Sequence, residues 1–380
     1  MVSFDFSNEQ ALLCESTRRF ARERLAPGAK AREDQHHIPY GLIRELGDNG
    51  LLGVNIPSEL GGAEAGVVAY ALAVREVAYA DAAVAVTMAV TNMVSEVITR
   101  FGSLVQKQTH VPKLVSGEYV GGAFALSEQG AGSDPGGMTT RAERHGDHWV
   151  LNGEKMWITT GDEAGVLVVW ARTGGPGSRG LSCFLVERDT KGLTAGKPEE
   201  KMGLRASHTV SLGLADVALP LDALLGQEGD GFKIAMTALD GGRIGVASQA
   251  LGIGFASLDE ARRYARERRQ FGKPLAEMQA VQFKLADMAT ELDAAWLLTL
   301  RAAWMKEQGG KYSREAAMAK VTASETANRA AREAVQIFGG YGYTEDYRVA
   351  RLMRDARVTQ IYEGTSEIQR VVIARETRLA

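Results

Sequence analysis

The sequence predicts a three-part fold in which two helical regions flank a small, mainly antiparallel β region. From Ser7 to about Gly117 the apolar residues recur at helical spacing. From there to about Gly231 short β-type runs are separated by glycines, and beyond it long helical patterns return. Strands gathered in the middle of a chain argue against a doubly wound parallel sheet, and so against a nicotinamide-type dinucleotide fold. The predicted domain boundaries are 1–118, 119–231 and 232–380.

The N-terminal region begins with a recognisable helix start. Ser7 followed three residues later by Gln10 fits a capping box, and Pro57 and Gly61 interrupt the helical pattern further on. No basic segment precedes an apolar run at the N-terminus, so we expect no signal peptide. The longest apolar segment, 82–94, is shorter than the roughly 20 residues that span a bilayer, so no membrane association is expected.

The middle region contains several short runs rich in β-branched and aromatic residues. Asn152-Gly153 lies between two of them and predicts a β-hairpin turn. His145 and His148 lie beside this turn; without further His or Cys at ligand spacing they predict a loop pair, not a metal site. The candidate strands are 120–126, 149–151, 155–159, 166–172, 182–187 and 209–214.

The C-terminal region reads as long helices. Apolar residues recur at three- and four-residue spacing around Met288, and 316–337 reads as a further long helix. The apolar series is Leu285, Met288, Leu292 and Trp296.

Composition and charge narrow the class of protein. The net charge of −3 gives no electrostatic reason to expect a nucleic-acid partner. The two cysteines, Cys14 and Cys183, have apolar neighbours and are expected to be buried free thiols, in keeping with a reducing compartment. A cytoplasmic location is expected, with a mature mitochondrial matrix form as the alternative.

One carboxylate near the C-terminus has an unusual setting. Glu363 stands between an aromatic residue and Gly364, and Thr365-Ser366 can open the next helix. A carboxylate on a turn before a helix start can be aimed at a ligand, which suits a general base that removes a proton from carbon. Taken alone, such a residue is more often a solvated turn residue.

Five segments of the chain carry motifs in a fixed order: 124–134, 157–159, 268–275, 336–342 and 361–369. These motifs resemble those of the acyl-CoA dehydrogenase family, across essentially the whole chain. Within the family the chain is most similar to the short-chain, butyryl-CoA dehydrogenase-type branch. The resemblance implies an N-terminal α-helical domain, a central antiparallel β-sandwich or barrel domain and a C-terminal four-helix bundle.

The resemblance also implies a reaction. Glu363 would abstract the α-proton of a short- or branched-chain acyl-CoA, and FAD would accept the β-hydride, giving the trans-2-enoyl-CoA. The backbone N–H of Glu363 and a flavin ribityl hydroxyl would bind the thioester oxygen. Electrons would pass to an electron-transfer flavoprotein, in fatty acid β-oxidation, from a homotetramer built as a dimer of dimers. One branch of the family carries its base at the position of Gly242, so a glycine there favours Glu363.

The resemblance assigns roles to the remaining motif residues. Leu126, Ser127 and Thr159 would bond the flavin ring edge, and Trp157 would cover one ring face, although a strand tryptophan is more often ordinary packing. Further flavin contacts would come from Phe124, Gly132, Ser133, Ile158, Thr365, Ser366 and Glu367. Substrate contacts would come from Ser133, Asp240, Gly241, Gly242, Arg243 and Gly364. The adenine and pyrophosphate would be held, partly for a neighbouring subunit, by Arg268, Gln279, Gln336 and Gly340. Phe271 and Gly339 would also contact the cofactor.

Several alternatives stay open at this level. Out of context, Asp240 and Arg243 are a helical charge pair, and the arginines of 262–269 are a solvated helix face. The chain could be a flavin-dependent acyl-CoA oxidase, an alicyclic acyl-CoA dehydrogenase or a non-catalytic acyl-CoA binder. The expected acyl wall, 83–99, lacks Lys and Arg, which disfavours a glutaryl group, and Glu96 on it has no evident role. The motifs do not encode the acyl group, pathway or electron acceptor.

Overall fold

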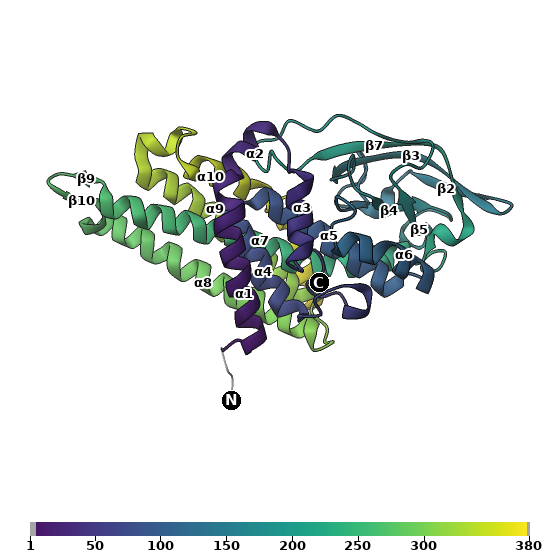
Figure 1. Cartoon of the computed structure of the whole chain (residues 1–380), viewed down its shortest axis with the longest axis horizontal. Coiled ribbons are helices and arrows are strands. Elements are labelled where there is room, and N and C mark those ends of the chain that lie inside the picture. Colours follow the sequence, from purple (N-terminus) through teal and green to yellow (C-terminus); the bar gives the residue numbers. More distant parts are fainter. Residues whose placement is uncertain (1–4, 378–380) are drawn as a thin grey trace.

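The computed structural model describes residues 5–377 and has the predicted order of helices, strands and helices (Figure 1). The first four residues, part of the segment used to argue against a signal peptide, lie outside the described residues. The capping box is confirmed: the Ser7 hydroxyl accepts from the Gln10 N–H at 3.2 Å, and the Gln10 side chain accepts from the Ser7 N–H at 3.0 Å. The N-terminal helices are α1 (Asn8–Phe20), α2 (Ala29–Gln35), α3 (Tyr40–Asp48), α4 (Gly66–Ala80), α5 (Ala82–Phe101) and α6 (Leu104–Val115).

Helix α5 is longer than the apolar segment that predicts it. Asp81 caps its N-terminus by accepting hydrogen bonds from the N–H groups of Ala83 and Val84 at 3.0 and 3.3 Å. By length and composition alone this helix could cross a membrane, but 83% of its most apolar window is buried inside the protein. It therefore fits a core helix, which packs between the sheet and the C-terminal helices.

The middle region forms one eight-stranded sheet (Figure 1). Most of its pairs are antiparallel, as predicted, but β1 and β2 both pair with β4 in parallel. The order is β6-β7-β3-β2-β4-β5-β8, with β1 on β4. The strands are β1 (Gly122–Ala125), β2 (Arg141–His145), β3 (His148–Thr159), β4 (Val166–Arg172), β5 (Leu181–Glu187), β6 (Leu193–Ala195), β7 (Thr209–Pro220) and β8 (Leu224–Leu225).

The predicted hairpin at Asn152-Gly153 is wrong. Strand β3 runs straight through both residues, and the turn lies at Gly146, between β2 and β3. The Asn152 amide instead pairs with Asp216 of β7, donating to its carboxylate at 3.1 Å and accepting from its N–H at 2.8 Å. At Gly153 the register shifts, and a Cβ there would lie 2.5 Å from the Thr140 hydroxyl. Glycine at 153 therefore permits a β-bulge in β3 and a close approach of its backbone to Thr140.

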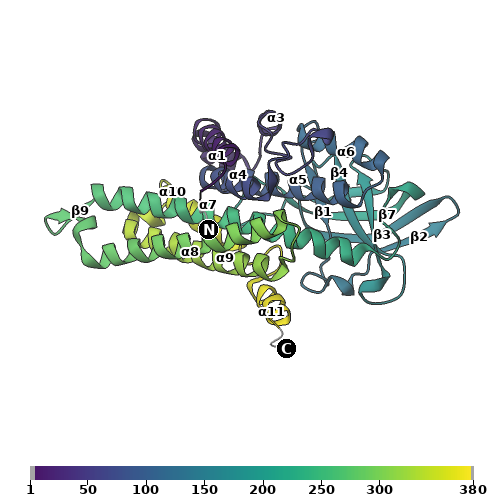
Figure 2. The same ribbon diagram turned by 90° about the horizontal axis from the view of Figure 1, so that it is seen from below.

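The C-terminal region is a bundle of long helices (Figure 2). The predicted apolar series is confirmed, since Met288, Leu292 and Trp296 are buried against α4, α7 and α9. Both cysteines are free and buried, as expected. The short hairpin β9–β10 lies at the far end of the bundle, away from the sheet (Figure 1). The elements are α7 (Gly231–Glu267), β9 (Arg269–Gln270), β10 (Lys273–Pro274), α8 (Gln279–Glu307), α9 (Ser313–Phe338), α10 (Arg348–Val358) and α11 (Ser366–Glu376).

Candidate active site

Glu363 lies in the turn between α10 and α11, as the sequence predicts. Glu363 and Gly364 both have left-handed backbone conformations, with φ of 53° and 87°. For a residue with a Cβ this conformation costs about 1–3 kcal/mol and is kept only where the surroundings enforce it. Thr365 caps α11 by accepting from the Ile368 N–H at 3.4 Å. We call residues 362–366 the base loop.

The Glu363 carboxylate is enclosed by helices of two other regions. A Cβ on Gly242 of α7 would lie 2.7 Å from its Oε2 and 3.0 Å from the Met93 sulfur of α5. Glycine at 242 therefore leaves the room that the carboxylate occupies. Within residues 5–377, this buried Oε2 has no hydrogen-bond partner. Burial raises the pKa of Glu363 to about 7, although Arg243 and Lys320 pull it down.

Arg243 and Asp240 form the helical pair that spacing suggests, but the pair is not merely solvated. Arg243 is buried, and burial lowers the pKa of its guanidinium. Asp240 also accepts from the Ser313 hydroxyl and lines a cavity of about 370 Å³. The same cavity is lined by three cations, Arg100, Lys311 and Arg314, and by two further carboxylates, Glu315 and Glu376. Its charged lining is therefore mixed, with Arg314 paired to Glu315.

The residues predicted to meet the flavin ring lie at the end of β1 and on β3. The Met156 N–H donates to the Ser127 carbonyl at 2.9 Å, which joins the two segments. Trp157 has a left-handed φ of 65°, and 59% of the residue is exposed, so ordinary core packing does not describe it. An exposed aromatic face beside backbone that can bond a ring edge fits a flat heterocycle. Gly132 and Ser133 are exposed on the loop after β1.

A buried ion pair, which the sequence analysis missed, supports the loop after β1 (residues 126–134). The Lys155 ammonium donates to the Glu128 carboxylate at 2.9 Å and to the Leu126 carbonyl at 3.3 Å. Burial lowers the pKa of Lys155 to about 8. Burial also works to raise the pKa of Glu128, but Lys155 and the Thr139 and Thr140 donors bring it to about 2. The only signal in the sequence was a charged residue on an otherwise inward-facing strand position.

A second group of predicted cofactor residues lies far from the base loop. Arg268 packs its guanidinium 5.5 Å from the centre of the Tyr341 ring, and both line a cavity of about 550 Å³ with Gly339 and Gly340. Phe271 is 93% exposed at the β9–β10 hairpin, at the opposite end of the bundle from the sheet (Figure 2). The fold therefore separates this group from Leu126 and Trp157 of the same chain.

Two further residues are better defined by the structure than by the sequence. The Ser366 hydroxyl, a predicted flavin contact, donates to Glu325 at 2.8 Å. Glu96, for which the sequence gave no role, accepts from the Lys306 ammonium of α8 at 2.7 Å. Lys306 therefore places a cation beside the segment 83–99 from a distant part of the sequence, and Glu96 neutralises it.

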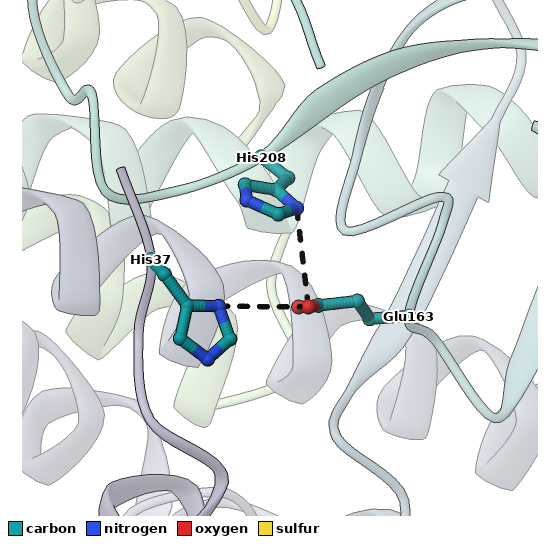
Figure 3. Close-up of side chains that lie close together, drawn as sticks. All are labelled: His37, Glu163 and His208. Atoms are coloured by element: carbon teal, nitrogen blue, oxygen red, sulfur yellow. Dashed lines mark ion pairs between the residues drawn. The ribbon is translucent and has the colours of Figure 1, made fainter. Parts of the chain in front are cut away.

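His37, Glu163 and His208 lie close together between the N-terminal helices and the sheet (Figure 3). Glu163 is 3.6 Å from His37 Nδ1 and 3.9 Å from His208 Nδ1. However, His208 Nδ1 donates to Asp162 at 2.6 Å and its Nε2 donates to the His36 carbonyl at 2.8 Å. Both partners are acceptors, so both ring nitrogens carry protons. This favours an imidazolium bridge between two regions over a metal ligand.

Comparison with known proteins agrees with this geometry. Family models described as acyl-CoA dehydrogenase N-terminal, middle and C-terminal domains match residues 7–118, 123–217 and 229–377. The mitochondrial short-chain specific acyl-CoA dehydrogenase of Mus musculus is 47% identical over 374 residues, 98% of this chain and 90% of the relative. The structure of butyryl-CoA dehydrogenase from Megasphaera elsdenii has a TM-score of 0.97 at 43% identity and covers 99% of this chain and 100% of that one.

A further similar chain comes from a structure described as the electron transferring flavoprotein of Acidaminococcus fermentans, with a TM-score of 0.97, 42% identity and 99% of both chains covered. The matched domains and relatives identify the chain as an FAD-dependent oxidoreductase. More closely, the chain belongs to the acyl-CoA dehydrogenase family, whose members use FAD.

Proposed function

We propose that this protein dehydrogenates a short-chain acyl-CoA between Cα and Cβ and releases the trans-2-enoyl-CoA, with Glu363 as the base. The observation that carries the proposal is the Glu363 carboxylate, buried against Gly242 with one oxygen unpartnered among residues 5–377. A structural carboxylate would have its hydrogen bonds satisfied. A base must keep a free lone pair for the proton that it removes.

The electrostatics of Glu363 suit removal of a weakly acidic α-proton. A pKa of about 7 keeps a large ionised fraction at neutral pH and gives a far stronger base than a solvated carboxylate. Arg243 and Lys320 stabilise the ionised form. We infer that the Glu363 backbone N–H helps to bind the thioester oxygen as negative charge grows on it. When bound, FAD supplies the acceptor for the β-hydride.

The chain's residues fit FAD. We propose that Leu126, Ser127 and Thr159 bond the ring edge, with Trp157 over one face. Open space at Gly132, Gly339 and Gly340, where a Cβ would meet nothing within 4 Å, permits close approach of a ligand to the backbone. The other proposed contacts are Phe124, Ser133, Ile158, Phe271, Thr365, Ser366 and Glu367, and for the adenine and pyrophosphate Arg268, Gln279 and Gln336.

For the CoA part, we propose the cavity beside α7. The cations Arg100, Lys311 and Arg314 line it together with the carboxylates of Asp240, Glu315 and Glu376. This mixed lining suits a ligand with both phosphates and hydrogen-bond donors. Asp240 is paired with Arg243, whose charge acts on Glu363, so this pair couples the cavity wall to the proposed base. Ser133, Gly241, Gly242 and Gly364 complete the proposed substrate contacts.

The separation of the Arg268 group from the loop after β1 supports an oligomer. We propose a homotetramer, built as a dimer of dimers, in which that group holds the cofactor of a neighbouring subunit. We further propose an electron-transfer flavoprotein as electron acceptor, a cytoplasmic location and the domain boundaries 1–118, 119–231 and 232–380.

Anaerobic titration with a panel of acyl-CoAs tests the function directly. The panel is butyryl-, hexanoyl-, isobutyryl- and glutaryl-CoA, and the readout is absorbance of the oxidised flavin. We expect butyryl-CoA to bleach the flavin and yield crotonyl-CoA, with glutaryl-CoA the weakest reductant. A flavin that no thioester bleaches would overturn the function, and peroxide in air at the rate of product formation would indicate an oxidase instead.

A further inference from the structure

Lys320 is a charged side chain in a place where charge is costly. It lies on α9 and has no exposed surface, among alanines of the bundle core. Its ammonium donates one hydrogen bond, of 2.8 Å, to the carbonyl of Gly364 in the base loop. Burial lowers the pKa of Lys320 to about 8, while the nearby Glu363 carboxylate favours the charged form. A lysine kept in such a site needs a reason beyond packing.

The base loop needs to be held in its conformation. Two consecutive left-handed residues place the Glu363 side chain against α7. The carbonyl of Gly364 accepts from both Lys320, at 2.8 Å, and the Gln369 amide, at 2.7 Å. Gln369 also donates to the Glu363 carbonyl at 3.1 Å. Two buried donors, one charged and one neutral, therefore hold the same turn.

Lys320 differs from the other cations near Glu363 in its ion pairing. Arg243 of α7 is paired with Asp240, and Lys306 of α8 with Glu96 of α5. Within residues 5–377, Lys320 forms no ion pair within 4 Å, so its charge stays available to the base. The other titratable groups near the base loop are Tyr70 of α4, Tyr362, Glu325 of α9, Asp355 of α10, and Glu367, Arg370 and Arg375 of α11.

We propose that Lys320 is a positioning residue for the catalytic base: it clamps the base loop through the Gly364 carbonyl and supplies the unneutralised positive charge that keeps Glu363 ionised. This rests on the proposed role of Glu363. Gln369 shares the clamping role but carries no charge. Variants of the two residues therefore separate the effect of holding the base loop from the effect of the positive charge on Glu363.

The test uses the holoenzyme and three variants, Lys320→Met, Lys320→Arg and Gln369→Leu. The rate of flavin reduction by saturating butyryl-CoA is followed anaerobically from pH 5.5 to 9.5, with flavin content and melting temperature measured alongside. In Lys320→Met we expect the rising limb of the pH profile to shift to higher pH by about one unit. At pH values below the limb, the rate would then be about tenfold slower than in the wild type. In Gln369→Leu we expect a slower rate with the limb unmoved. Lys320→Arg should restore the limb at least in part.

An unmoved limb in Lys320→Met, with flavin content retained, would overturn the proposal. If Lys320→Met fails to fold, the comparison passes to Lys320→Gln, which is shorter and neutral but polar. If both neutral variants fail to fold, Lys320 is required for folding and not specifically for positioning the base, which would also overturn the proposal. A wild type that butyryl-CoA does not reduce would instead refute the function on which it rests.

Discussion

Glu128 and Glu363 are two enclosed carboxylates in one chain, and their surroundings give them opposite acidities. Glu128 lies in the loop after β1 and accepts from Lys155 at 2.9 Å, from the Thr139 N–H at 2.6 Å and from the Thr140 N–H at 3.0 Å. Its pKa is about 2. Glu363 lies in the base loop with its Oε2 unpartnered among residues 5–377, and its pKa is about 7.

Burial acts in the same direction on both residues, so burial alone does not make a base. The difference lies in the donors: backbone N–H groups and an ammonium saturate Glu128, whereas the cations near Glu363 act at a distance. A satisfied carboxylate fixes a structure, and an unsatisfied one is free for chemistry. The same substitution, Glu to Gln, should therefore have opposite effects on stability at the two positions.

Glu128→Gln should give the larger change in stability. It leaves the Lys155 ammonium buried without its counter-charge, which costs about 3–5 kcal/mol. Because the pKa of Glu128 is lowered on folding, its contribution is present above its unfolded value near 4.5 and is lost as the pH falls through about 2. Urea unfolding at pH 7 measures the loss. Glu154→Gln, at the exposed neighbour of Lys155, is the control, and equal stability of the two variants would contradict the account.

Glu363→Gln should stabilise the flavin-free protein at high pH. The pKa of Glu363 is raised on folding, so ionisation costs stability as the pH rises from about 4.5 through about 7. Above pH 8 the variant should gain up to about 3 kcal/mol, and at pH 4 it should match the wild type. Unfolding of both proteins at pH 4, 6 and 8.5 measures this. A variant destabilised at pH 8.5 would show that the carboxylate is satisfied after all.

Gly242→Ala should disturb the base without greatly changing the fold. The new methyl would lie 2.7 Å from the Glu363 carboxylate and 3.0 Å from the Met93 sulfur, so the carboxylate must shift. We expect kcat to fall about tenfold, since misplacement of a reacting group by about 1 Å is costly. Gly41→Ala in α3 is the control, because its methyl would meet nothing within 4 Å. Steady-state kinetics that rank the two variants equally would argue against a tightly enclosed base.

His208→Gln should give the smallest change in stability. It extends the comparison to a third carboxylate, Asp162, whose partner His208 itself titrates. The Asp162 carboxylate raises the pKa of His208, so this contribution is full below about pH 6.5 and is lost as the pH rises through the raised value. The variant should lose about 1 kcal/mol at pH 6 and less at pH 9. Thermal unfolding at the two pH values measures the difference. A loss independent of pH would mean that His208 is neutral in the fold.

The helix–sheet–helix order was predictable because hydrophobic period and glycine spacing are local properties. The same local rule failed at Asn152-Gly153, where the Asn152 side chain pairs with Asp216 on another strand and Gly153 meets Thr140. Turn chemistry and bulge chemistry use the same residue types, so sequence alone could not separate them.

The residues of the candidate site also fall into two groups, those that the sequence could predict and those that it could not. Glu363, Trp157 and Asp240 stand in motifs and could be named from the sequence. Lys155 and Lys320 could not, because a lysine inside an amphipathic pattern is normally expected at the surface, and only the fold shows which carbonyl or carboxylate it meets. The pKa values of about 2 and 7 likewise arise from contacts between distant segments.

The most direct measurement is the pH dependence of anaerobic flavin reduction by butyryl-CoA in the wild type and Glu363→Gln. In the wild type, the rate should rise with pH through an apparent pKa near 7, as Glu363 ionises. In the variant we expect intact flavin binding and a rate lower by about 100- to 10,000-fold, with that limb absent. A variant that keeps both the rate and the limb would contradict the assignment of Glu363 as the base.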